Sequence, residues 1–202
     1  MRKYLRALFK SSFILVASSA SAMAAVSPLS VAIVPPLQFP SQDFTVVGAR
    51  VSAIWGRHHN VYGFDLGVIG NVTEGSFGGI GVSGIFNLTE GTTTILGLQL
   101  AGAANVNVSK ARIFGLQVTA GVNSNQAEST LVGIGLAVLS NNSPFMTVYG
   151  AQVGLYNKAR EVYGFQIGLV NVTESLHGIQ IGLLNYNTRG LFAVAPILNI
   201  GF

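Results

Sequence analysis

A short motif repeated along most of the chain constrains the fold more than any other feature of the sequence. Each copy reads as glycine, an apolar residue, a polar or small residue, another apolar residue and a small residue, and eight of the nine copies close on asparagine. The copies start 14 to 18 residues apart, at Gly48, Gly63, Gly79, Gly97, Gly115, Gly133, Gly150, Gly164 and Gly178. Such internal similarity indicates a chain built from equivalent structural units.

The alternation inside each copy predicts β-structure. Apolar residues alternate with Gly, Gln, Ala or Ser, which is the period of a strand with two unlike faces. Polar segments rich in Gly, Asn, Ser and Pro separate the copies and are typical of turns. We therefore predict an all-β domain of ten strands, at residues 43–56, 61–72, 78–88, 94–106, 112–123, 130–140, 146–157, 161–172, 177–187 and 191–202.

Two architectures use such a repeat. A parallel β-solenoid would stack equivalent residues, and the asparagine at one end of each copy favours it. An antiparallel up-and-down β-barrel is favoured by the Gly-apolar-Gln-apolar-Gly core, which reads alike in both directions, and by midpoints between copies that fall in or beside the turns. The few polar residues left in each repeat cannot build a second apolar wall for a solenoid. The barrel is the main prediction, and the solenoid is the alternative.

The ends of the chain indicate export. A basic start, the apolar run 13–17 and the small residues around Met23 predict a signal peptide at 1–24. Residues 25–42 are expected to be a lead segment or plug, because their prolines disfavour a regular strand. The barrel domain then covers 43–202. Apolar residues alternate up to Phe202, and this ending resembles the C-terminal insertion strand of bacterial outer-membrane β-barrel proteins.

The repeat carries a second resemblance. Tandem Gly-x-Gln-x-Gly-x-x-Asn units over about residues 48–187 resemble those of bacterial surface-repeat proteins. This resemblance implies a protein of the bacterial cell envelope and brings no known active site with it. Both resemblances point to the outer membrane or cell surface of a Gram-negative bacterium.

Charge and motifs exclude several function classes. Without residues 1–24, seven basic residues balance seven acidic ones, so no basic patch for nucleic acid is expected. The chain has no cysteine for a disulfide or a thiolate metal site. His58, His59 and His177 are expected to be solvated turn residues. No Ser-His-acid motif or phosphate loop is recognisable, so we expect no enzymatic activity, cofactor or metal.

The central polar position of the repeat supplies the candidate site residues. We expect a neutral, Gln- and Gly-lined barrel interior, with the apolar parity (Phe165, Ile167 and Leu169, for example) facing lipid. Arg50 and Asp65 are expected to form an interior ion pair across the first hairpin, and Phe202 to act as an insertion signal. The predicted lumen-facing belt comprises Arg50, Asp65, Gln99, Gln117, Gln152, Gln166 and Gln180.

These features favour an outer-membrane envelope protein, either structural or a small passive pore, with membrane lipid and the outer-membrane insertion machinery as partners. One alternative is a cell-surface repeat protein, a β-solenoid acting in interaction. The other is a soluble barrel that binds an apolar ligand.

Overall fold

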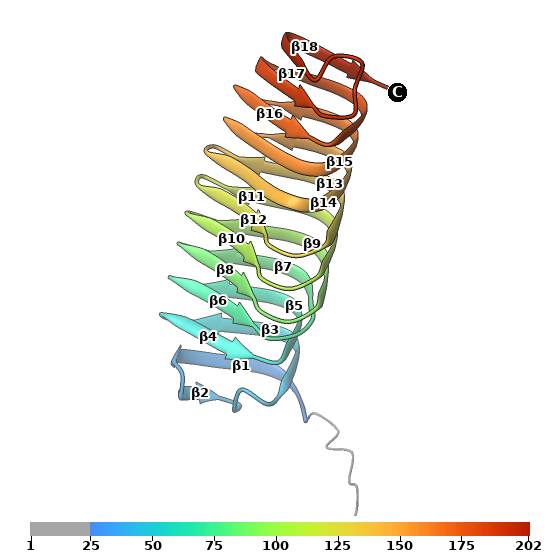
Figure 1. Ribbon diagram of the computed structural model, residues 1–202. Helices are drawn as coiled ribbons and strands as arrows, with labels where there is room; N and C mark the ends of the chain where they lie inside the picture. Colours follow the sequence, from blue (N-terminus) through green and yellow to red (C-terminus); the bar gives the residue numbers. More distant parts are fainter. Residues whose placement is uncertain (1–24) are drawn as a thin grey trace, which may run out of the picture.

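The chain winds as a β-solenoid of about ten turns. The computed structural model describes residues 25–202, and the predicted signal peptide at 1–24 lies outside the described residues. Within them the chain is all-β, and its turns stack along one axis (Figure 1). Strand follows strand into a single 18-stranded sheet. We call each turn of the solenoid a rung.

A rung consists of a long strand followed by a short one. The separate long strands are β3 (Thr45–Ser52), β5 (Asn60–Gly67), β7 (Phe77–Ser83), β9 (Thr93–Ala101), β11 (Ala111–Thr119) and β13 (Ser129–Ala137). The separate short strands are β4 (Trp55–His58), β6 (Gly70–Thr73), β8 (Phe86–Thr89), β10 (Ala104–Asn107), β12 (Val122–Asn125) and β16 (Val170–Thr173). Long and short segments are continuous in β14 (Ser140–Val153), β15 (Tyr156–Ile167) and β17 (Ser175–Asn187).

The predicted barrel is wrong, and its alternative, the solenoid, is the observed fold. Equivalent residues of neighbouring rungs pair in parallel, so that Asn105 lies beside Asn87 and Gln117 beside Gln99. A meander would have placed the asparagines at alternating ends of its strands. All but the last two predicted strands also divide in two, as where residues 61–72 form β5 and β6 with a corner between them.

The backbone conformation explains why each motif opens with glycine. Gly164 has a φ of 137°, a region that residues with a side chain rarely adopt. A Cβ atom built on Gly164 would lie 2.1 Å from the carbonyl oxygen of Gly150 in the preceding rung. Eight equivalent glycines share the positive φ. The repeat therefore requires glycine here to let the rungs approach each other.

Both ends of the described chain join the stack. β1 (Val26–Val34) pairs in parallel with β3 and antiparallel with β2 (Leu37–Phe39). Residues 25–42 thus contribute the first rung, in place of the expected lead segment or plug, because the prolines at 35, 36 and 40 fall outside β1. At the other end β18 (Val194–Gly201) pairs antiparallel with β17 and closes the last rung. Phe202 follows it, fully exposed.

Candidate interaction surface

The inside of the solenoid is more polar than apolar. Among residues 25–202, 32 polar or charged residues are buried, against 16 buried hydrophobic ones. The apolar part is mainly one column, which runs from Val46 through Ile113 to Leu176, two residues before each motif glycine. Much of the rest of the interior is filled by Asn and Gln side chains that hydrogen-bond from rung to rung. This removes the argument against a solenoid, since no second apolar wall is needed.

An asparagine ladder runs along one side of the interior. From Asn71 to Asn171, each amide Nδ2 donates to the Oδ1 of the asparagine in the next rung, over 2.8 to 3.0 Å, and the ladder ends at Asn185. The same Nδ2 also donates to a backbone carbonyl, as Asn123 does to Leu136 at 3.0 Å. The terminal asparagine of each motif therefore satisfies buried polar groups and links successive rungs.

The predicted polar belt lies inside the solenoid beside this ladder. Gln99, Gln117, Gln152, Gln166 and Gln180 are all buried. Gln180 donates to Gln166, and Gln166 to Gln152, both at 2.8 Å, and Gln117 donates to Gln99 at 2.9 Å. These side chains fill the interior and bond to one another. The prediction that they line a barrel lumen is therefore wrong, as is the barrel itself.

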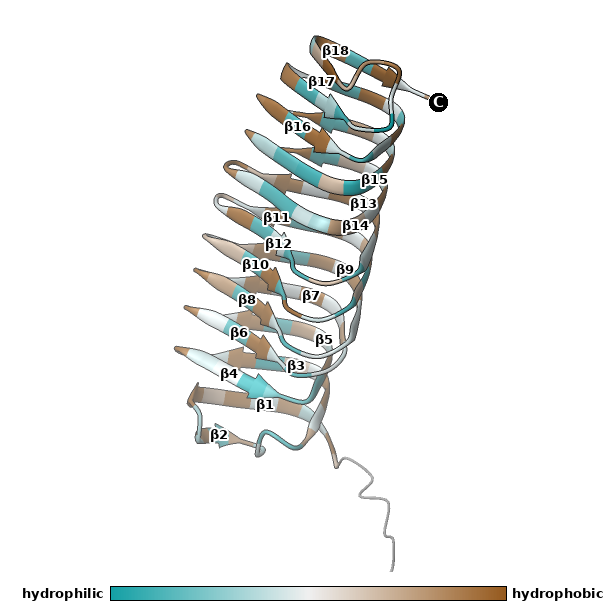
Figure 2. Cartoon of the chain, viewed as in Figure 1, coloured by the Kyte–Doolittle hydropathy of each residue, from teal (hydrophilic) through white to brown (hydrophobic). Residues whose placement is uncertain are grey.

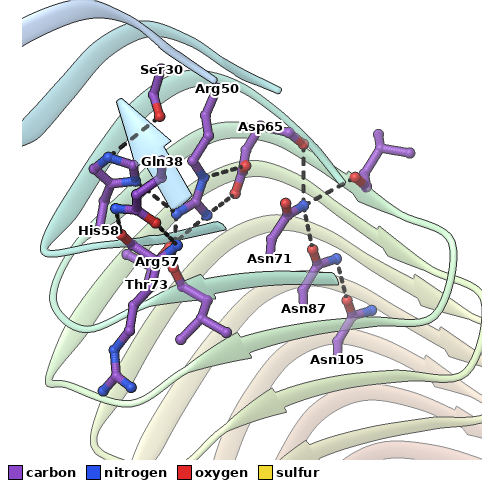
Figure 3. A network of polar contacts seen from close by, with 12 residues as sticks. Ser30, Gln38, Arg50, Arg57, His58, Asp65, Asn71, Thr73, Asn87 and Asn105 are labelled. Atoms are coloured by element: carbon purple, nitrogen blue, oxygen red, sulfur yellow. Dashed lines mark hydrogen bonds and ion pairs between the residues drawn. The ribbon is translucent and has the colours of Figure 1, made fainter. Parts of the chain in front are cut away.

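The predicted ion pair between Arg50 and Asp65 is present, within a buried network near the N-terminal end (Figure 3). Arg50 Nε donates to Asp65 Oδ1 at 2.7 Å, and Nη2 to Oδ2 at 2.6 Å. The two residues pair in parallel between β3 and β5, so the predicted hairpin is wrong. Arg50 also donates to the carbonyl of Val72 at 2.8 Å. The pair occupies the column that glutamines fill in later rungs.

His58 belongs to the same network and is buried, contrary to the expectation of a solvated turn. Arg50 Nη1 lies 3.5 Å from His58 Nδ1, and Ser30 Oγ lies 3.3 Å from Nε2. Because arginine only donates, Nδ1 accepts and Nε2 carries the proton. Burial, together with the charge of Arg50, lowers the pKa of His58 to about 4. The imidazole is therefore neutral at pH 7 and serves the interior packing.

The outside of the long strands is apolar. Three columns of outward-facing side chains stand in register along it, and we call them the apolar flank. They are represented in one rung by Phe114, Leu116 and Val118, and in another by Tyr163, Phe165 and Ile167. Tyr149, Tyr163 and His177 stack on one another, with ring centroids 4.9 and 4.5 Å apart. Phe165 is 48% exposed and Ile167 41%, so these side chains lie on the surface.

The two corners of each rung differ in character. The corner from long to short strand, which we call the apolar corner, carries Ile54, Val68, Ile85, Leu155, Leu169 and Leu183, all exposed. It runs along the left edge of Figure 2, where brown recurs from rung to rung. The return corner, from short to long strand, is the charged corner. Apart from the buried pair, all charged residues of 25–202 lie at or beside it.

Ion pairs connect charges of different rungs along the charged corner. Arg57 pairs with Glu74 and with Glu90, both at 2.7 Å. Further along, Glu128 lies 3.3 Å from Lys110 and 3.6 Å from Arg160. In cross-section the solenoid is thus amphipathic along its whole length, with charge on one corner and apolar surface on the opposite corner and flank.

The apolar flank is large for an exposed surface. Nine motif-bearing rungs spaced about 4.8 Å apart, each with about 20 Å of long strand, give roughly 860 Å². The largest apolar patch on a typical soluble monomer is about 300–600 Å², and larger patches mark interaction sites. The alternation in the motif predicted which residues point outward. It did not reveal that the corner residues between the glutamine and asparagine positions extend this surface.

The described residues contain no group of His, Cys, Asp and Glu side chains arranged to hold a metal ion. Over residues 25–202 there is also no helix of the length and hydrophobicity that crossing a membrane requires. Compared with known proteins, the chain matches no family model, no curated protein and no solved structure.

Proposed function

We propose that this chain is a cell-surface repeat protein of a bacterial envelope, and that its solenoid acts in interaction by lying on a membrane lipid layer. The apolar corner and flank would contact the lipid, while the charged corner faces water. The observation that carries the proposal is the segregation of the exposed apolar columns from every unburied charge. The export signal expected in residues 1–24 is consistent with such a location.

The fold suits an apolar environment for a second reason. Backbone N–H and C=O groups of the rungs are paired with those of neighbouring rungs, so the flank presents no unpaired edge. Unpaired backbone groups are what exclude open sheets from hydrocarbon. Charges along the full length of one corner favour an axis parallel to the lipid surface, since an upright solenoid would bury the charged corner in lipid.

Flotation with vesicles of neutral phosphatidylcholine tests this function, because a neutral lipid leaves hydrophobic contact as the driving force. We expect the mature chain to float with the vesicles. Phe165→Glu combined with Leu116→Glu places charge on the apolar flank and should weaken binding about tenfold or more, since burying one such side chain is worth about 1.5–3 kcal/mol.

A control variant adds a negative charge at the opposite corner instead. Gln126 is exposed at the charged corner, so Gln126→Glu should leave flotation unchanged. If the mature chain stays in solution, or if Gln126→Glu and the flank variant behave alike, the lipid-contact proposal is wrong. A chain that forms dimers through the flank and ignores vesicles would likewise contradict it and assign the surface to self-association.

A further inference from the structure

A groove of about 690 Å³ lies on the C-terminal part of the apolar corner. One wall is the last outward column of the long strands, including Val118 and Ile167, and the other is the corner column with Leu155 and Leu169. In three of the rungs that the groove crosses, those of β14, β15 and β17, the corner is shorter by one residue. Gln166 and Asn171 are five positions apart, whereas six positions separate the glutamine and asparagine of earlier copies.

Between the two walls the groove has a nearly bare floor. Gly154, Gly168 and Gly182 occupy this position in successive rungs. A Cβ atom at Gly168 would meet the Gly154 carbonyl in the adjacent rung, so a side chain here would collide with the stack. The floor therefore stays open along the solenoid axis.

The length of the groove is set by the rungs it crosses. Its lining runs from β11 to β17, which is five successive rungs, or about 19 Å at 4.8 Å per step. Ile197 of β18 adds to the lining at the far end. Its φ of 69° is unusual for a β-branched residue, and the side chain is 72% exposed. The space is thus long and has an apolar residue at one end.

The lining is almost entirely apolar. Floor amides are already paired, with Gly154 N donating to Ile167 O and Gly168 N to Ile181 O, both at 3.0 Å. Thr119 is the polar side chain among the lining residues, and its oxygen accepts from Gly121 N at 3.1 Å. A peptide in the groove would leave its backbone groups unsatisfied, whereas a hydrocarbon chain has none to satisfy.

We propose that this groove seats one acyl chain of a lipid from the layer on which the solenoid lies. The inference rests on the proposed function and deepens it, since the groove is continuous with the apolar corner that would contact the lipid. The length and the apolar lining both fit a single extended acyl chain. The corner of the early rungs, represented by Val68, lies outside the groove lining and should contact lipid without holding a chain.

Binding of monomeric palmitoyl lysophosphatidylcholine, followed by isothermal titration calorimetry on the mature chain, tests the inference. We expect saturable binding with one lysolipid per protein. Leu169→Lys should weaken it about tenfold or more, since a wall side chain is lost and a charge is introduced. Val68→Lys is the matched control and should bind as the unmodified chain does. Leu183→Lys serves as a second groove variant if Leu169→Lys fails to fold.

Vesicle flotation of the same proteins separates the two claims. Flotation of the unmodified chain without saturable lysolipid binding would overturn the groove and leave the proposed function in place. Equal losses of lysolipid binding in Leu169→Lys and Val68→Lys would also overturn it. Saturable binding that only the groove variants lose supports the acyl-chain site whatever the flotation result.

Discussion

The asparagine ladder makes a quantitative prediction at Asn123, in the middle of the stack. Its side chain is buried, accepts from Asn105 at 2.9 Å, and donates to Asn141 at 2.9 Å and to the carbonyl of Leu136 at 3.0 Å. Asn123→Ala removes these three hydrogen bonds, each worth about 1 kcal/mol net. It also leaves Asn141 Oδ1 facing the vacated space, which costs about 1–3 kcal/mol.

We therefore expect Asn123→Ala to lower the free energy of unfolding by about 4–6 kcal/mol. Urea unfolding followed by far-ultraviolet circular dichroism measures this loss. Asn142→Ala is the control, because Asn142 is exposed on the same segment as Asn141, and a surface substitution of this kind costs at most about 0.5 kcal/mol. A loss at Asn123 as small as that at Asn142 would refute the role given to the ladder.

Three further predictions concern the N-terminal network and the register. The pKa of His58 is lower in the folded state than in the unfolded chain, so its contribution to stability is complete above pH 6.5 and is lost as pH falls toward 4. That loss amounts to about 3 kcal/mol, and His58→Asn should flatten this part of a urea-unfolding pH series. Arg50→Gln or Asp65→Gln alone leaves a buried charge and should lower the free energy of unfolding by about 3–5 kcal/mol. The double variant should recover much of this stability, since glutamines pair in this column elsewhere. Additive losses in the two single variants and the double variant would contradict the coupling. Cysteines replacing Leu96 and Phe114 should form a disulfide on mild oxidation, because these residues are direct neighbours in parallel register. An antiparallel meander would separate them by about 20 Å. Failure to form the disulfide would count against the solenoid.

The sequence predicted the class of structure and the facing of the side chains. Alternation within the motif placed Phe165 and Ile167 outside and Gln166 inside, as observed. It also brought Arg50 and Asp65 together. These features depend only on the period of a strand and on equal spacing of copies, and both hold for a barrel as well as for a solenoid.

The sequence did not determine the direction of strand pairing. Equal spacing places a polar segment midway between two central positions in either architecture, so the midpoints carried no information about direction. The asparagine at one end of each copy did carry it, because only parallel stacking lets Asn87 bond to Asn105. The asparagine position favours a solenoid only if buried amides can fill its interior. The expectation that a solenoid needs a second apolar wall argued against such an interior.

Neither was the groove predictable from composition. Its floor includes Gly154 and Gly168, in rungs whose corner is one residue shorter, and it lies between two apolar rows that only the stacking of the rungs brings together. His58 was likewise misplaced, because its neighbours His59 and Asn60 have the character of a turn. Its burial and its contact with Arg50 show that the side chain points inward.

The central claim is that the apolar flank contacts lipid while the charged corner remains in water. Since the chain has no cysteine, nitroxide labels can be placed on single cysteines replacing Phe165 and Gln126 in vesicle-bound protein. Collision with oxygen, which concentrates in lipid, is then compared with collision with a water-soluble nickel chelate. The account predicts that oxygen dominates at position 165 and the nickel chelate at position 126. The same ratio at both positions, or the reverse order, would contradict it.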